Sequence, residues 1–328
     1  MGKTRLASGL GLGALVAIAL LWAGSSTAAS NAHPGAEEAA PPAGEPLTIN
    51  WIERDPHPIE GLLLKVEPED AEDLGAFFER QGFGMAGVRA GARSVPRVAV
   101  TRLPQDLKAL RRAEERKLLF LRSVLPLVLL SNEEIRTWRG RLLALQEAVQ
   151  AGAEPAPEDR AWLAEMAERY GSDPQDLDAL LRRVDEVPVS LALGQTILES
   201  GWGTSRLAIE GNALFGETTP STAVPHLVQR VEGGKRFRAF PSLLESVRAY
   251  MHNLNSHPAY RRFREQRAAQ RALGVMPSGK LLLPTLERYA ELPQYLKLVR
   301  SLIRSNGLEE LESARLDRDW FASRDASF

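Results

Sequence analysis

Leu191-Ala-Leu-Gly-Gln-Thr-Ile-Leu-Glu-Ser-Gly-Trp-Gly-Thr-Ser-Arg206 places one carboxylate, that of Glu199, in an otherwise apolar predicted helix. Ile197, Leu198 and Trp202 are expected to remove water from this carboxyl group, and no basic residue is its immediate neighbour. Burial disfavours the charged form, so we expect the pKa of Glu199 to lie above its ordinary value of about 4.3. A carboxyl group that is protonated at neutral pH can act as a general acid.

The helix is predicted to end abruptly on two glycines, Gly201 and Gly203, with Trp202 between them. Glycine tolerates the sharp turn that would bring a ligand close to the acid. The tryptophan would either shield the carboxyl group from water or stack on a sugar ring. From helical periodicity alone, the alternative for Glu199 is a helix-end glutamate that reaches solvent.

Composition limits the chemistry that this chain can perform. The chain has 328 residues, 44% apolar content and a formal net charge of -1, which gives no general attraction to nucleic acid or to an anionic membrane. The absence of cysteine excludes disulfides, thiolate metal sites, cysteine nucleophiles and a lipoprotein anchor. The histidines do not fall at the i, i+4 spacing of a zinc helix, so we expect no metal and no cofactor.

The N-terminus has the pattern of an export signal. Lys3 and Arg5 precede an apolar stretch, and small residues then lead to Ala29, so residues 1–29 are predicted to be a signal peptide. An uncleaved anchor is the alternative, because the apolar stretch is close to the minimum length of a membrane-spanning helix. Residues 30–47 are rich in Ala, Pro, Gly and Glu and are predicted to be a disordered linker.

The remaining chain divides by pattern into a small N-terminal segment of unknown role (48–102), a mainly helical domain (103–307) and a C-terminal tail (308–328). Apolar periodicity predicts the helices of the domain, and Gly233-Gly234 predicts a β-hairpin turn. The helices are expected at 105–130 with a kink at Pro126, and at 133–148, 158–170, 174–184, 188 onward, 242–255, 282–290 and 294–306, with the hairpin at 224–240.

Longer runs of the sequence resemble a known family. The run from Ala192 to Ala208, followed by Gly211-Asn-Ala-Leu-Phe-Gly216, is similar to the signature of the bacterial glucosaminidases of glycoside hydrolase family 73. The runs from Glu114 to Leu129 and from Phe240 to Tyr260 resemble the Bax subgroup of that family. The resemblance implies a lysozyme-like helical domain with a small hairpin beside the catalytic cleft. It also implies cleavage of N-acetylglucosaminyl bonds in peptidoglycan, with Glu199 as the general acid.

A second catalytic group is harder to assign. The resemblance implies a further carboxylate near the hairpin, where Glu217 is the first candidate and Glu210 and Glu232 are alternatives. Tyr289 matches a tyrosine that related enzymes place in the cleft, although the continuation Ala290-Glu-Leu-Pro293 departs from the usual pattern. Without a second carboxylate, the N-acetyl group of the substrate could act as the nucleophile.

Four further residues are candidates for substrate binding: Trp202, Asn212, Phe215 and Tyr260. For Asn212 and Phe215 the competing interpretation is structural, as a loop support and as packing beneath the cleft. For Tyr260 the competing interpretation is packing at a helix end.

Three functions remain open from the sequence: a peptidoglycan hydrolase in the periplasm or cell envelope, a lytic transglycosylase on the same substrate, and a non-catalytic wall-binding protein. Glycan strands of peptidoglycan are the expected partner, with membrane contact only through an N-terminal anchor. The basic residues Arg261, Arg262, Arg264, Arg267 and Arg271 are interleaved with polar residues, which predicts a solvated helix face rather than a nucleic-acid site.

Overall fold

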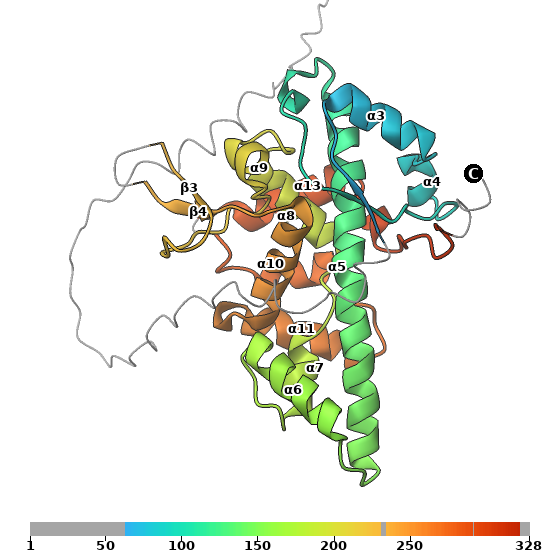
Figure 1. Cartoon of the computed structure of the whole chain (residues 1–328), viewed down its shortest axis with the longest axis vertical. Coiled ribbons are helices and arrows are strands. Elements are labelled where there is room, and N and C mark those ends of the chain that lie inside the picture. Colours follow the sequence, from blue (N-terminus) through green and yellow to red (C-terminus); the bar gives the residue numbers. More distant parts are fainter. Residues whose placement is uncertain (1–62, 231–233, 291, 322–328) are drawn as a thin grey trace, which may run out of the picture.

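The computed structural model describes residues 63–230, 234–290 and 292–321 (Figure 1). The predicted signal peptide (1–29) and linker (30–47) lie outside these residues, as does the candidate Glu232. The described chain is mainly helical with two small two-stranded sheets, which confirms the predicted fold class. None of its helices combines the length and the apolar character needed to cross a membrane.

A single long helix, α5 (Ala113–Gln150), runs along one side of the molecule (Figure 1). Two separate helices with a start at residue 105 were predicted, and this prediction is wrong: residues 107–109 form a short 3-10 turn, η2, and Pro126 lies inside α5. Proline within a helix costs about 3 kcal/mol because it removes a hydrogen bond and crowds the preceding turn. Packing of α5 against neighbouring helices offsets this cost, since residues 119–132 are all buried.

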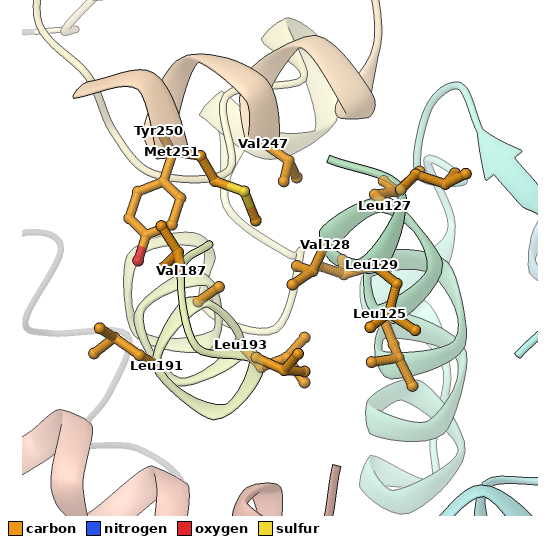
Figure 2. Packing of buried hydrophobic residues seen from close by; sticks show 14 of the residues in the cluster. Leu125, Leu127, Val128, Leu129, Val187, Leu191, Leu193, Val247, Tyr250 and Met251 are labelled. Atoms are coloured by element: carbon orange, nitrogen blue, oxygen red, sulfur yellow. The ribbon is translucent and has the colours of Figure 1, made fainter. Parts of the chain in front are cut away.

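Helix α8 (Val189–Ser200) lies at the centre of the core and begins directly after Pro188, as predicted. Helix α13 (Tyr295–Ser305) packs closely on it at Gly194, where an added Cβ would lie 2.7 Å from Cγ1 of Ile303. Figure 2 shows side chains of α8, α5 and α10 (Leu243–Ser256) meeting in one apolar cluster. The acid-bearing helix is therefore held rigidly on several sides.

The N-terminal annex, residues 63–112, joins the same hydrophobic core as the rest of the chain. Its strands β1 (Leu64–Val66) and β2 (Val98–Val100) pair in parallel, and its helices are α3 (Ala71–Arg80) and α4 (Met85–Arg89). Ion pairs fix the annex to α5: Arg97 with Glu133 at 2.7 Å, and Glu79 with Arg122 at 2.6 Å. The annex is thus packed against the domain that carries Glu199.

The hairpin is present as predicted, with β3 (His226–Val228) antiparallel to β4 (Arg236–Arg238). Phe237 faces Leu227 in the register and is buried. The short helix α9 (Arg206–Gly211) contacts β3 and connects the acid-bearing helix to the hairpin. Helix α10 follows β4 directly, and its first turn is capped by the hydroxyl of Ser242.

The helices α6 (Pro157–Tyr170), α7 (Leu177–Arg183) and α11 (Arg261–Ala272) pack at the far end of α5 from the annex (Figure 1). The predicted helix at 282–290 is wrong, because Pro284 follows the short helix α12 (Gly279–Leu282), and only a 3-10 turn, η4 (Leu283–Thr285), continues the chain. Two further 3-10 turns complete the core, η3 (Pro258–Tyr260) and η5 (Leu308–Leu311), so the tail predicted from residue 308 begins as part of the packed structure.

The predicted solvated face of α11 is also wrong in part. Arg264 and Arg267 are buried. The Arg267 guanidinium donates to the backbone carbonyls of Asp185 at 2.9 Å and of Arg182 at 3.1 Å. The last carbonyls of a helix have no partner within it, so Arg267 satisfies the C-terminal end of α7. These cations are structural anchors.

Candidate functional site

Glu199 lies in the last turn of α8, and the chain leaves this helix through three consecutive left-handed residues. The φ angles are +58° at Gly201, +61° at Trp202 and +74° at Gly203. The Ser200 hydroxyl accepts a hydrogen bond of 2.9 Å from the amide of Gly203, which holds the turn. The predicted sharp turn after the acid is therefore confirmed, and it includes the tryptophan itself in a conformation that costs a non-glycine residue free energy.

Substitution of Gly203 by alanine should destabilise the fold by about 2 to 4 kcal/mol, since the residue would adopt a left-handed conformation and meet packed side chains. An added Cβ at Gly203 would lie 2.5 Å from Cδ1 of Leu103 and 2.7 Å from Cδ2 of Phe120. Gly91→Ala is the matched control, because Gly91 has φ +68° and no atom within 4 Å of the added Cβ. Urea denaturation measures both, and equal losses would contradict the steric argument.

The carboxyl group of Glu199 is densely surrounded, although the residue keeps a partly accessible surface. Burial raises its pKa to about 7, and a hydrogen bond from Tyr295 opposes the increase. On the other side the chain approaches closely, since a Cβ added to Gly216 would lie 3.6 Å from Oε2 of Glu199. The raised pKa predicted from the apolar helix is confirmed, and the group can carry a proton near neutral pH.

Tyrosines surround the acid. Tyr295 and Tyr250 are buried. Burial raises the pKa of each hydroxyl well above its ordinary value, and the charge of Glu199 adds to this increase. Tyr289 stacks on Tyr295 with ring centroids 5.4 Å apart. The ring centroids of Tyr260 and Tyr289 are 6.0 Å apart. Glu199 also helps to raise the pKa of Tyr289, so the structure brings this tyrosine near the acid, while its role in a substrate cleft stays a prediction.

Sequence reasoning missed three residues of this site: Gln195, Tyr250 and Tyr295. The Tyr250 hydroxyl donates to Oε1 of Gln195 at 2.7 Å, and Nε2 of Gln195 donates to the Tyr295 hydroxyl at 2.9 Å. One signal for Gln195 was present in the sequence. It lies one helical turn before Glu199 in an otherwise apolar helix, so it shares a face with the acid.

Glu217 is not a free carboxylate. It forms an ion pair with Arg238 of β4 at 2.9 Å, and its pKa is raised by burial and lowered in part by Arg238. Its second oxygen, Oε1, is buried with no hydrogen-bond partner. The alternative candidate Glu210 is exposed and pairs with Arg206 at 3.0 Å. Glu217 directly follows Gly216, where an added Cβ would lie 3.6 Å from Oε2 of Glu199.

The remaining predicted residues divide into packed and partly exposed groups. Phe215 is 4% exposed and stacks on Tyr250 at 3.8 Å, so it packs beneath the site. Asn212 has φ +51°, ends α9, and donates through its amide to the Phe240 carbonyl at 3.0 Å. Trp202 is half-buried with its ring edge-to-face against Phe120, and Tyr289 is half-buried as well.

Tyr260 is buried and hydrogen-bonds Asn253. Both Glu217 and Glu199 help to raise the pKa of Tyr260, which burial takes to about 12. Tyr260 therefore lies near both candidate carboxylates, and its hydroxyl stays protonated at neutral pH.

A cavity of about 430 Å³ lies between the annex and the hairpin, and Glu199 is not part of its lining. Arg238 borders the cavity and also holds Glu217, so the cavity adjoins the site through this residue. Lys65 of β1, Arg248 and Glu245 contribute further charges to the lining. Within residues 63–230, 234–290 and 292–321, no cluster of His, Asp and Glu side chains could hold a metal ion.

Solved structures to which this chain is similar include an autolysin domain and a glycoside hydrolase domain. The catalytic domain of the autolysin Auto from Listeria monocytogenes aligns with a TM-score of 0.31 and 19% identity, over 51% of this chain and 96% of that domain. The glycoside hydrolase domain of FlgJ from Salmonella typhimurium aligns with a TM-score of 0.30 and 23% identity, over 51% of this chain and 99% of that domain.

Sequence comparison is more informative. Residues 176–308 match the Glucosaminidase family, described as mannosyl-glycoprotein endo-beta-N-acetylglucosaminidase. Protein bax of Escherichia coli is 34% identical over 191 residues, which cover 56% of this chain and 67% of that protein. The matched range contains Glu199, Glu217 and the tyrosines of the site. The chain therefore belongs to the Bax-type branch of the glucosaminidases of glycoside hydrolase family 73.

Proposed function

We propose that this glycoside hydrolase is an exported enzyme that cleaves β-1,4 glycosidic bonds at N-acetylglucosamine in peptidoglycan, with Glu199 as the general acid. One observation carries the proposal: burial raises the pKa of Glu199 to about 7, and this residue lies in the last turn of α8, directly before the left-handed turn at residues 201–203. Glycosidic cleavage needs a proton delivered to the leaving oxygen, and a carboxyl group with a pKa near neutrality supplies it.

The ion pair between Glu217 and Arg238 affects which group stabilises or attacks the sugar carbon once the leaving oxygen is protonated. A carboxylate that is held by a guanidinium is a weaker nucleophile and base than a free one, because its charge is already compensated. Burial and Tyr295 are the influences on the pKa of Glu199, and no described carboxylate is among them. This arrangement favours attack by the N-acetyl oxygen of the substrate. Tyr289, the half-buried tyrosine of the site, is the candidate to contact that group.

The sequence of residues 1–29 supports export to the periplasm or cell envelope, where peptidoglycan is found. Fusion of residues 1–47 to a reporter that is active only after export tests this part directly. Accumulation of the reporter in the cytoplasm would contradict it.

Digestion of purified peptidoglycan, with the product ends resolved by mass spectrometry, tests the reaction itself. New reducing N-acetylglucosamine ends are expected. Anhydro-muramyl ends would instead identify a lytic transglycosylase, in which the same acid serves but the substrate closes on itself. Binding without any new ends would identify a wall-binding protein and would overturn the proposal.

A further inference from the structure

We propose that Tyr295 is a positioning residue for Glu199, and that Gln195 and Tyr250 fix the direction in which the Tyr295 hydroxyl donates. The inference rests on the proposed role of Glu199 as the acid. It concerns a continuous chain of hydrogen bonds from Tyr250 through Gln195 and Tyr295 to the carboxyl group.

The direction of this chain follows from the chemistry of its members. A side-chain amide donates only through nitrogen and accepts only through oxygen. Gln195 accepts from Tyr250 at 2.7 Å and donates to Tyr295 at 2.9 Å. The Tyr295 oxygen is therefore already an acceptor, and its own hydrogen is left for Glu199, to which it is hydrogen-bonded. Every donor in the chain points toward the acid.

Burial makes the chain rigid. Gln195 is 0% exposed, Tyr250 is 1% exposed and Tyr295 is 4% exposed, so water does not compete for these groups. Phe215 stacks flat on the Tyr250 ring at 3.8 Å, and Tyr289 stacks on the Tyr295 ring. Hydrogen bonds in such an environment polarise one another, so the loss of one weakens the next.

The chain has a specific consequence for an acid. A donor aimed at the carboxyl group stabilises the carboxylate that remains after the proton has left. Burial alone would hold the proton too strongly, and Tyr295 acts against burial. The tyrosine therefore makes Glu199 a better proton donor while fixing the direction of its carboxyl oxygens.

In the part of the chain that the structure describes, four tyrosines interact with Glu199: Tyr250 on α10, Tyr260 at η3, Tyr289 after η4 and Tyr295 on α13. Burial raises the pKa of each of them. On α5, the Lys117 ammonium lies over the Trp202 ring, 5.5 Å from its centroid. The tyrosines therefore stay protonated while Glu199 titrates, and Glu217, whose pKa burial also raises, is the other carboxyl group to follow separately in a titration.

The test is a titration of the Glu199 carboxyl carbon by NMR, in protein labelled with ¹³C at glutamate and with Glu199→Gln used for assignment. Tyr295→Phe should raise the pKa of Glu199 by about one unit, since a hydrogen bond to a charged group is lost. In digestion assays the alkaline limb of kcat/KM should move upward by the same amount. Rates at pH 5, where the acid is protonated in both proteins, should fall about 10-fold.

Two variants at Gln195 test the direction. Gln195→Met removes both hydrogen bonds at similar volume, and it should shift the pKa of Glu199 upward by less than Tyr295→Phe does. Gln195→Glu offers an acceptor to Tyr295 in place of a donor, so the tyrosine hydrogen turns away and the upward shift should equal or exceed that of Tyr295→Phe. Tyr170→Phe is the matched control, because Tyr170 is an equally buried tyrosine on α6 and Glu199 is not among the groups acting on it.

An unchanged Glu199 pKa in folded Tyr295→Phe would overturn the positioning role, whatever the activity. A downward shift in Gln195→Glu would overturn the assigned direction. Should Tyr295→Phe fail to fold, Gln195→Met decides the question by the same titration. The expected shifts in a protein that leaves peptidoglycan intact would support the hydrogen-bond chain and refute the proposed function, so the two can fail separately.

Discussion

Glu199→Gln is expected to lower the rate of peptidoglycan cleavage by about 100-fold to 10,000-fold, the usual contribution of a positioned general acid. Glutamine matches glutamate in volume but has no proton to deliver at any pH. The change leaves the apolar environment of α8 intact, so the loss should fall on kcat rather than on binding. Release of soluble fragments and the count of new reducing ends measure it.

The pH dependence should carry the signature of the acid. Because the pKa of Glu199 is raised to about 7, the wild-type enzyme holds the proton below that pH and loses it above. The rate of the wild type should therefore fall as pH rises through about 7, and the residual rate of Glu199→Gln should not show this limb. Glu210→Gln, which changes an exposed carboxylate on the adjacent α9, is the matched control and should retain activity. Equal rates for wild type and Glu199→Gln would remove Glu199 from the reaction.

Glu199→Gln should lower activity but raise the free energy of unfolding at alkaline pH. A carboxyl group with a folded pKa of about 7 and an ordinary value of 4.5 binds its proton more tightly in the folded protein, so it destabilises the fold increasingly as pH rises through that window. Glutamine carries no charge to desolvate. Glu199→Gln should therefore unfold at a higher urea concentration than wild type at pH 8 and at a similar one at pH 4. This result also distinguishes a catalytic defect from a folding defect.

The predicted features that the structure confirms are those encoded by local sequence. The apolar character of α8 indicated that Glu199 would be desolvated, and the direction of its pKa shift followed from that. The tyrosines that complete its burial come from other helices. The left-handed turn followed from Gly201 and Gly203, since glycine is the residue that adopts this conformation without strain.

The hydrogen-bond chain that ends at Glu199 could not be predicted from local sequence. Gln195 and Tyr295 are 100 residues apart in sequence, and their contact depends on α13 packing across Gly194 of α8. Periodicity identifies which face of each helix is apolar, but it does not determine which helices meet or in what register. The partner of Glu217 was missed for the same reason, because Arg238 approaches it from the hairpin.

The charge pattern of α11 led to a wrong prediction at Arg267, because the end of another helix supplies the hydrogen-bond partners of this residue. Arg267 was expected at a solvated surface because long cationic side chains are mostly exposed. The carbonyls at the end of α7 instead accept its hydrogen bonds, and the carboxylate of Asp185, 3.5 Å from Nε of Arg267, compensates its charge in the interior. A sequence identifies the cation but not the helix terminus that folding brings to it.

Asp185→Asn is expected to cost about 3 to 5 kcal/mol of unfolding free energy, because it removes the anion from a buried cluster of cations. Asp185 is 2% exposed and lies in the loop between α7 and α8. Arg271 donates to both of its carboxyl oxygens, at 2.9 and 2.7 Å, and Nε of Arg267 lies at 3.5 Å. Arg139 of α5 completes the cluster at 3.8 Å.

The loss should be large because Arg267 would remain fully buried after its counter-charge is gone, whereas the partly exposed Arg271 keeps its ion pair with Glu186 at 3.3 Å. Replacing a whole buried ion cluster by apolar residues is often tolerated, whereas removing one partner leaves uncompensated charge in a medium of low dielectric constant. Glu265→Gln on α11 is the matched control: its ion pair with Arg261 is exposed on both sides, and its loss should change the free energy of unfolding by less than about 1 kcal/mol.

The same cluster should set the acid sensitivity of the fold. Its arginines hold the pKa of Asp185 below the ordinary value of 3.8, against the effect of burial. A carboxyl group with a lowered folded pKa contributes stability that is complete above its unfolded pKa and is lost as pH falls through the folded one. The difference between wild type and Asp185→Asn in urea denaturation should therefore stay constant from pH 7 to about 4 and shrink only below that. A difference that shrinks near neutral pH would contradict the role of Asp185, since it would mean that the carboxylate is already losing its charge there.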